Sequence, residues 1–376
     1  MVKRIFVKGD CKNCRARATL DFLAQSSYVY FYSNPFYLVP LSRSKLSHFI
    51  LNLWRKFDYL YGLPKLLISD AIYVLPKSHL YAIEILIAKL FSKKIIHEFY
   101  VSSYDYPVIE MKNLNPKSRQ AKLLLKRDQK RVDFSDVLIF LNKSEKDYYL
   151  DVINREESGN RIFLVPLCTD MKRYAKLPYV NHKNDTFTIC WWGEMHTLHN
   201  VGKIIDSVKF LKKMRINFKL YLFGICDKIS KPYIKQIHDN NLEDYVTIDN
   251  SKRFHDGSLE NFLYYNCDLA LGNFGDSKKA HIVMSNKIAE ASSMGLPILS
   301  QKISSLLEFY INNESIFFTR SDPESIANTI YLIYKDKTRL KEVSRNSYKV
   351  YLRNFSKRVN KKKMDEVFGQ AFNLND

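Results

Sequence analysis

Short apolar runs alternate with amphipathic stretches along the whole chain, and this alternation limits the fold more than any other feature of the sequence. The apolar runs, which we predict to be strands, lie at 3–9, 27–33, 66–75, 94–100, 137–142, 161–167, 186–193, 218–224, 245–250, 267–274, 297–301 and 315–318. Short apolar strands joined by helices are typical of a parallel sheet that is covered on both faces. The sequence therefore predicts an α/β protein with two doubly wound, Rossmann-like sheets.

A polar segment without clear periodicity, 168–185, separates the two halves of this pattern. We therefore predict an N-terminal domain over 1–167 and a C-terminal domain over 186–345. A basic helical tail, 346–376, is expected to return toward the N-terminal domain. Because ligands of open α/β sheets bind at the carboxyl ends of the strands, we expect a site in a central cleft that both domains face.

The chain carries 59 Lys and Arg against 39 Asp and Glu, a net charge of +20, which favours polyanionic partners. The segments Ser42–Gly62 and Pro116–Arg131 mix basic with bulky apolar residues, as helices lying on anionic lipid headgroups do. An amphipathic core helix with a lysine-rich outer face has the same pattern. The aromatic residues lie mostly inside strand patterns, so we expect no nucleic-acid partner.

No apolar run is long enough to span a bilayer, and the start of the chain shows no signal peptide. Cys11 and Cys14 form a single C-x-x-C without the second pair that a zinc site needs. We expect a cytoplasmic protein with reduced thiols, no metal and no resident cofactor, peripheral at the inner face of the plasma membrane.

The stretch Cys267–Ser300 predicts a strand, a basic polar loop, a short helix and a second strand. Ser285 is placed to cap the helix and Gly295 to end it. Lys287 and Glu290 lie three residues apart and hence on one face. A helix N-terminus with a nearby lysine suits a diphosphate, and a carboxylate one turn later can bind a ribose diol. An ordinary amphipathic helix with a solvated Lys–Glu pair would look the same.

Several motifs follow one another in the second half: VPLCTDMKRY (165–174), WWG ending at Gly193 with His199-Asn200-Val201 beyond it, LYLFG ending at Gly224, NCDLAL (266–271), GNFGDSKKAHIVMSNKIAEASSMGLPI (272–298) and DPESIANTIYLIYKD (322–336) followed by Phe355-Ser356. Together they resemble the motifs of retaining, nucleotide-sugar-dependent glycosyltransferases of the GT-B fold, of the family 4 type. The resemblance covers most of 165–356 and is much weaker in the N-terminal half.

The resemblance implies a donor domain in the C-terminal half and an acceptor domain in the N-terminal half. It implies transfer of a hexosyl unit from a nucleoside diphosphate sugar, with retention and without a metal, because protein cations and helix termini stabilise the leaving diphosphate. The acceptor would be a saccharide or a lipid-linked saccharide, in surface polysaccharide or glycan biosynthesis. An anionic membrane surface would be a second partner.

The resemblance also implies roles for individual residues. Lys279 and Lys287 would contact the diphosphate, and Glu290 would bind the ribose. Gly193 would let the backbone approach the phosphates, and Gly224 would lie beside the base.

His199 would donate a hydrogen bond to the phosphates, and Asn286 would orient the leaving phosphate or cap the helix. His97 would contact the transferred sugar, with Glu98 as an alternative acid beside it. Asp105 would contact the acceptor.

The chain departs from the family pattern at four positions. Ile282 stands where the family has a first glutamate, and Glu194 and His199 stand where it has arginine and lysine. Asn200 replaces the following glycine. Lys279 and Lys287 would then carry more of the diphosphate charge, and Asp276 is the candidate to replace the missing acid. These departures leave a non-catalytic binding protein of the same fold as an alternative, with a nucleic-acid-binding protein behind it.

Overall fold

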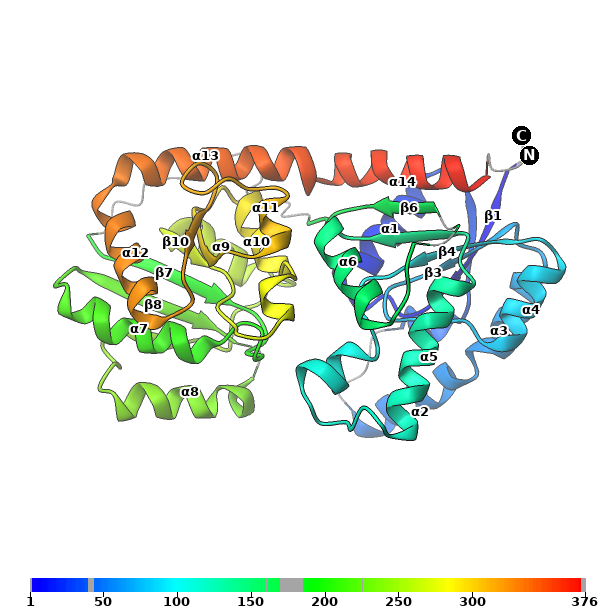
Figure 1. Ribbon diagram of the computed structural model, residues 1–376, viewed down its shortest axis with the longest axis horizontal. Coiled ribbons are helices and arrows are strands. Elements are labelled where there is room, and N and C mark those ends of the chain that lie inside the picture. The colour runs from blue at the N-terminus through cyan, green and yellow to red at the C-terminus, as the bar shows by residue number, and fades with distance from the viewer. Residues whose placement is uncertain are drawn as a thin grey trace. The chain divides into compact units, whose positions relative to one another are not determined.

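The computed structural model describes residues 2–39, 44–157, 159, 161–169, 185–224 and 226–372. The chain divides into two compact units, of which unit 1 comprises Met1–Cys168 with Asn360–Asp376 and unit 2 comprises Thr169–Val359. Each unit is a parallel sheet with helices on both of its faces (Figure 1). The predicted linker 168–185 lies mostly outside the described residues.

The sheet of unit 1 has the strand order β2-β1-β3-β4-β5-β6 with all neighbours parallel. Its strands are β1 (Arg4–Lys8), β2 (Val29–Tyr32), β3 (Ala71–Val74), β4 (Lys94–Glu98), β5 (Val137–Phe140) and β6 (Arg161–Leu164). The helices between them are α1 (Cys14–Gln25), η1 (Pro35–Tyr37), α2 (Lys45–Lys56), α3 (Asp58–Leu67), α4 (Ala82–Leu90), η2 (Tyr106–Glu110), α5 (Arg119–Asp133) and α6 (Lys143–Val152).

Unit 2 repeats the arrangement in the order β12-β11-β10-β7-β8-β9, again with parallel neighbours. Its strands are β7 (Phe187–Trp192), β8 (Phe218–Phe223), β9 (Val246–Ile248), β10 (Leu269–Leu271), β11 (Ile298–Gln301) and β12 (Phe317–Thr319). Its helices are α7 (Val201–Lys213), α8 (Asp227–Asp239), α9 (Ser258–Asn266), η3 (Lys279–His281), α10 (Asn286–Ser293), α11 (Ser304–Leu307), α12 (Pro323–Lys335) and α13 (Lys337–Asn354).

The last helix, α14 (Lys357–Phe372), completes the core of unit 1. Its Phe368 is fully buried and stacks on Phe22 and on Tyr73, with ring centroids 5.6 and 5.5 Å away. Met364 and Val367 are buried in the same cluster. The end of the chain therefore packs against the sheet built from its beginning.

The predicted α/β class with two doubly wound parallel sheets is confirmed. A strand is present within or next to each predicted run, and the largest difference is at 66–75. There α3 continues to Leu67, with Pro64 inside the helix, and β3 begins only at Ala71. The apolar run spans both a helix end and a strand, and periodicity cannot separate the two.

Candidate functional site

The predicted helix after β10 is present as α10. Ser285 occupies the N-cap position with an extended backbone (φ −85°, ψ 152°), and Gly295 follows the helix end with φ +66°. The Ser285 hydroxyl is buried and has no hydrogen-bond partner among the described residues. The side chain at the cap therefore accepts none of the first N–H groups of the helix, and the Ser285 carbonyl accepts the Ile288 N–H at 3.1 Å. A helix N-terminus favours an anion.

Lys287 projects from the first turn of α10 and is buried. Its Nζ lies 4.2 Å from the centroid of the Trp191 ring and 3.1 Å from His199 Nδ1. Gly193, with φ +131°, follows β7 beside it, so that an added Cβ would lie 3.8 Å from Nζ. Within the described chain, no carboxylate forms an ion pair with Lys287, and burial holds its pKa well below the ordinary value.

Glu290, one turn further along α10, is half-buried. Its Oε2 accepts a hydrogen bond of 2.7 Å from Trp192 Nε1. Burial raises the pKa of this carboxyl group, and the Trp192 bond and Lys287 partly oppose that shift. Trp191 thus contacts the amino group of Lys287, and Trp192 donates a hydrogen bond to the carboxyl group of Glu290.

His199 joins the loop after β7 to the loop after β10. Its Nδ1 lies 2.6 Å from Asn273 Oδ1, and the Phe274 N–H donates to the His199 carbonyl at 3.2 Å. Burial and the neighbouring Lys287 lower the pKa of His199 to about 2, so the imidazole is neutral. Gly275 is required in the second loop, because an added Cβ would overlap the Leu198 carbonyl oxygen.

Three other predicted residues lie nearby in the sequence but in different surroundings. Asp276 is exposed and forms an ion pair with Lys203 of α7. None of its described contacts reaches Lys287. Lys279 is buried at the start of η3, and Asn286 is the half-buried first residue of α10.

Gly224 follows β8, as predicted, at a point of close approach between two loops. An added Cβ would overlap Asn250 Oδ1 and lie 3.0 Å from both Met195 Cε and Ser230 Oγ. Arg253 also donates a 3.3 Å hydrogen bond to the Gly224 carbonyl. A side chain at this position would push apart the loops after β8 and β9.

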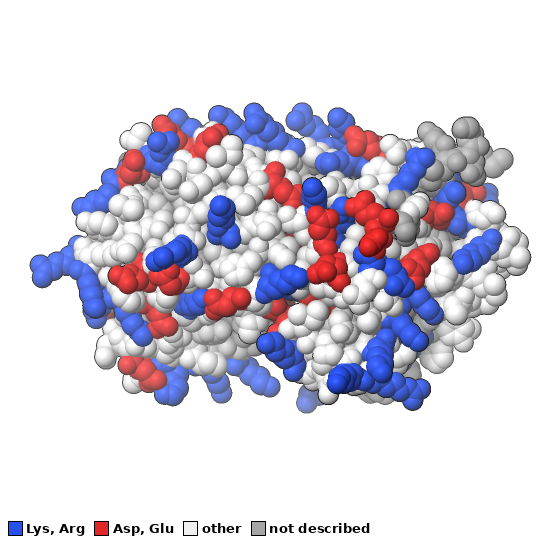
Figure 2. All heavy atoms as spheres, viewed as in Figure 1, with Lys and Arg blue, Asp and Glu red and all other residues white. Residues whose placement is uncertain are grey.

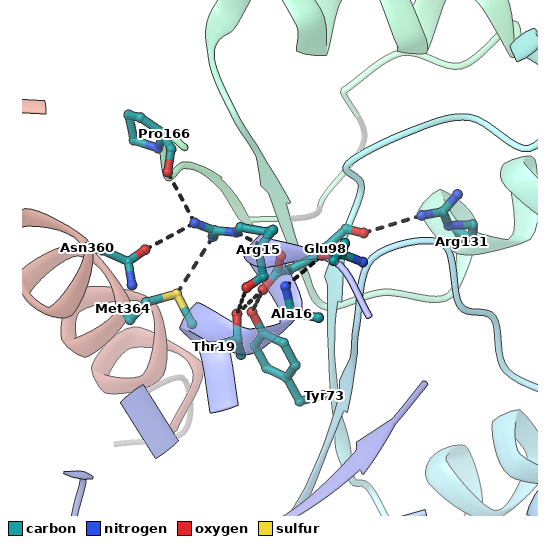
Figure 3. A network of polar contacts seen from close by, with 10 residues as sticks. Arg15, Ala16, Thr19, Tyr73, Glu98, Arg131, Pro166, Asn360 and Met364 are labelled. Atoms are coloured by element: carbon teal, nitrogen blue, oxygen red, sulfur yellow. Dashed lines mark hydrogen bonds and ion pairs between the residues drawn. The ribbon is translucent and has the colours of Figure 1, made fainter. Parts of the chain in front are cut away.

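Glu98, predicted as a catalytic acid, lies in a buried polar network of unit 1 (Figure 3). Its Oε2 accepts from Arg15 Nε at 2.9 Å, and its Oε1 accepts from Thr19 Oγ1 and from the Tyr73 hydroxyl. Arg15 also donates to Asn360 of α14 at 3.0 Å. The carboxylate thus ties β4 to α1, β3 and α14, and both of its oxygens are used in doing so.

His97 and Asp105 are buried as well. Arg131 Nε donates to His97 Nε2 at 3.0 Å, and burial together with Arg131 holds the pKa of His97 well below its ordinary value. Asp105 accepts a 2.6 Å hydrogen bond from the Tyr148 hydroxyl. Contact of either residue with a sugar or an acceptor stays a prediction.

The sequence did not single out Trp191, Trp192 or Asn273. The signal was present for the tryptophans, because two large polar-tipped aromatics directly precede a glycine at a strand end. Within the described residues, no group of three or more His, Cys, Asp or Glu side chains is arranged to hold a metal ion. The candidate site consists of the buried Lys287, the half-buried Glu290, the two tryptophans that contact them and the N-terminus of α10.

No protein-family model and no curated protein matches the chain. Solved structures do match it over its whole length. HepE from Anabaena, in complex with UDP, superposes with a TM-score of 0.67 and 11% identity over 98% of this chain and 100% of that one. A glycosyltransferase from Rickettsia africae (TM-score 0.64, 12% identity) and sucrose-phosphate synthase from Thermosynechococcus elongatus (0.65, 13%) each match over 100% of both chains.

These matches show that the chain has the GT-B fold of glycosyltransferases, as the sequence motifs predicted. At 11–13% identity they show the fold alone. Among the described helices, none combines the length and the apolar character that crossing a bilayer requires.

Proposed function

We propose that this protein is a glycosyltransferase that binds a nucleoside diphosphate sugar in unit 2 and moves its hexosyl group, with retention, to a saccharide acceptor. The observation that carries the proposal is Lys287, a buried lysine without a carboxylate partner among the described residues, at the N-terminus of α10. A buried amino group is costly to charge unless an anion lies beside it, so binding an anion is a reasonable purpose for this lysine.

A diphosphate at this position would receive the N–H groups of α10, the Lys287 ammonium and, from η3, Lys279. Gly193 would let the backbone approach the phosphates, and Glu290 would accept both hydroxyls of the ribose. Solved structures of HepE hold UDP and UDP-glucose, which supports testing a uridine donor first.

Charge that develops on the leaving diphosphate would be stabilised by these protein groups, so we propose transfer without a metal. Retention without a covalent intermediate relies on such stabilisation and on alignment of the two substrates. His97 and Asp276 stay predicted sugar contacts. Glu98 is left out of the proposed chemistry because its two oxygens are engaged in the unit 1 network.

We further propose a saccharide or lipid-linked saccharide as the acceptor, in the synthesis of a surface polysaccharide at an anionic membrane. The net charge of +20 supports this placement. The alternative is a GT-B protein that binds a partner without catalysis. Its support comes from Ile282 and Glu194, because the resembled family has other residues at these two positions.

The test is a titration of UDP-, GDP- and dTDP-sugars, followed by donor hydrolysis. Glu290→Ala removes the acceptor of two ribose hydrogen bonds, which are worth about 1.5–3 kcal/mol, so donor affinity should fall about tenfold to a hundredfold. Glu314→Gln removes an exposed acid of the same unit and should change nothing. EDTA should leave hydrolysis unchanged.

Three results would contradict the proposal. Binding of no donor would favour the non-catalytic alternative. Full turnover by the Glu290→Ala variant would remove the assignment of the ribose site. Tight binding of DNA or RNA that weakens steeply with salt would revive the nucleic-acid alternative.

A further inference from the structure

Helix α2 is turned with its apolar side away from the protein. Leu46 and Phe49 are 69% and 66% exposed, and Leu53 on the same side is exposed too. Arg55, on the opposite side, is buried and donates to the carbonyl oxygens of Phe36 and Val39 at 3.0 and 2.9 Å. A surface helix of a globular protein ordinarily buries its apolar stripe and exposes its charges. This helix exposes its apolar stripe and buries Arg55.

The next two helices repeat the inversion. Leu60 of α3 and Leu90 of α4 are exposed, the latter by 73%. The acids of the same helices point inward, where Lys8 of β1 forms ion pairs of 2.7 Å with Asp58 and 2.8 Å with Glu84. The buried side of this layer therefore carries Arg55 and both acids, and its outer side carries the large apolar side chains.

These three helices lie next to one another, since α3 packs on both α2 and α4 (Figure 1). We call their outer side the α2–α4 surface and define it by Leu46, Phe49, Leu53, Leu60, Leu86 and Leu90, all of them exposed. Soluble monomeric proteins rarely expose large apolar side chains on three adjoining helices in this way. The α2–α4 surface is therefore expected to have a partner.

The exposed charged residues within α2, α3 and α4 are all basic. The acids of α2, α3 and α4, namely Asp58 and Glu84, are buried, whereas Lys45, Lys56 and Lys89 are exposed. Helix α5 follows α4 in the chain and exposes further cations: Lys122, Lys126, Arg127 and Lys130. In the view of Figure 2, lysine and arginine side chains gather over the part of unit 1 where α5 lies.

A cavity of about 330 Å³ lies between α4 and α5. Its walls include the apolar side chains of Ile85 and Leu123 and the cations Lys126, Arg127 and Lys130. In the described part of the chain, none of these three cations has a hydrogen bond or an ion pair. Apolar walls with unpaired cations at one side suit the phosphate and adjoining glycerol carbons of a lipid headgroup.

We propose that the α2–α4 surface binds to an anionic lipid bilayer. Its leucines and Phe49 would lie at the boundary of headgroups and acyl chains, and the cavity between α4 and α5 would hold a lipid phosphate. Charge decides between this occupant and a second copy of the chain. A two-fold contact through the surface would bring the lysines of both copies together, which is unfavourable. An anionic membrane supplies the apolar layer and the negative charge at once.

This inference deepens the membrane part of the proposed function and rests on it for the acceptor that would be reached there. Its test needs no sugar donor, so the two can fail separately. The protein is sedimented with vesicles of phosphatidylcholine, and with vesicles in which one lipid in three is phosphatidylglycerol. We expect binding to the second kind, weakening with salt, and little binding to the first.

Two triple variants separate the two components of the surface. Leu46→Ser with Phe49→Ser and Leu53→Ser removes apolar contacts, and Lys126→Gln with Arg127→Gln and Lys130→Gln removes charge. Each should weaken binding to the anionic vesicles by at least about tenfold. Leu332→Ser changes an equally exposed leucine (66%) on α12 of unit 2 and should bind as the unaltered protein does.

The Tm of all three variants, measured by thermal unfolding, should stay close to that of the unaltered protein, because every altered side chain is exposed. Equal binding to both vesicle types, or unchanged binding by either triple variant, would overturn the proposal. A dimer in solution that the apolar triple variant dissociates, without vesicle binding, would assign the surface to a second copy instead. Donor binding that survives while vesicle binding is absent would leave the transferase proposal intact and remove this one.

Discussion

Replacing Lys287 with methionine should leave the empty protein about as stable as before, or more stable, and should weaken its binding of nucleotide. Methionine has nearly the same length and fills the same space against Trp191. It removes an amino group that is buried without a carboxylate among the described residues, and exchanges of buried charges for apolar side chains are often neutral or stabilising by about 1–4 kcal/mol.

The contacts that the substitution loses set the lower end of the stability change. The 3.1 Å contact with His199 Nδ1 contributes at most about 1 kcal/mol, because the same nitrogen also lies 2.6 Å from Asn273 Oδ1. A cation–π contact contributes about as much, and only while the amine is charged. We therefore expect a net change between a loss of about 1 kcal/mol and a gain of about 2 kcal/mol, the latter an increase in Tm of up to roughly 8 °C for a domain of this size.

The effect on UDP should have the opposite sign. A charge-assisted contact to phosphate is worth about 1.5–3 kcal/mol, so Kd should rise about tenfold to a hundredfold. At a UDP concentration of a hundred times the original Kd, binding stabilises the fold by about 2.7 kcal/mol. With a Kd a hundredfold weaker, the same concentration stabilises it by only about 0.4 kcal/mol.

Thermal unfolding with and without UDP measures both effects in one experiment, and calorimetry gives Kd directly. Lys228→Met removes an exposed lysine from α8 and should alter neither value. A large loss of stability in the empty Lys287→Met variant would mean that the lysine holds the fold together. An unchanged Kd would mean that no phosphate lies against it. Either result refutes the reasoning.

The pH dependence follows from the lowered pKa of Lys287. Between that value and the ordinary lysine value the unfolded chain binds more protons, so this group makes stability rise with pH, and the rise should vanish in the methionine variant. Diphosphate favours the ammonium form, so nucleotide binding should take up protons and weaken as pH rises. Calorimetry in two buffers of different ionisation enthalpy measures that uptake.

Two further substitutions test the polar networks of the two units. Arg15→Met leaves Glu98 buried without its ion-pair partner, so the free energy of unfolding measured in urea should fall by about 3–5 kcal/mol, and adding Glu98→Gln should recover part of it; a loss below about 1 kcal/mol would contradict the assigned role. Trp192→Phe removes the donor to Glu290, which should then turn toward Lys287 and weaken UDP binding about tenfold, whereas unchanged affinity would show that the indole does not keep the two charges apart.

The sequence predicted the strands and the helix α10 well because both depend on local pattern. Apolar runs and helix punctuation such as Gly295 are readable one segment at a time. Which side of α2 faces outward could not be predicted in this way. Its periodicity shows that one side is apolar, but only the packing of Arg55 against the carbonyls of Phe36 and Val39 shows that this side faces outward. The segment 116–131 differs from α2, because its helix α5 packs on the protein with one side and exposes a basic side to solvent.

Glu98 shows why the role of a residue in unit 1 is hard to predict from the sequence. Strand-end position favours function, yet residues 95–98 are all buried because both faces of the sheet are covered. Without the alternation of a half-exposed strand, nothing local tells whether an acid faces a ligand or the interior. Its partners Arg15 and Asn360 come from opposite ends of the chain, so the network has no local signature.

The buried ionisable groups of the two units contrast in a way that bears on function. In unit 1, Lys8 is neutralised by Asp58 and Glu84, and Arg15 by Glu98. In unit 2, Lys287 and Glu290 lie one turn apart on α10 without bonding each other, because the Trp191 ring takes one and the Trp192 Nε1 takes the other. Mutual neutralisation would be the cheaper arrangement for a protein that only had to fold. Keeping both groups uncompensated is reasonable where a ligand brings an anion for the lysine and hydroxyl donors for the acid.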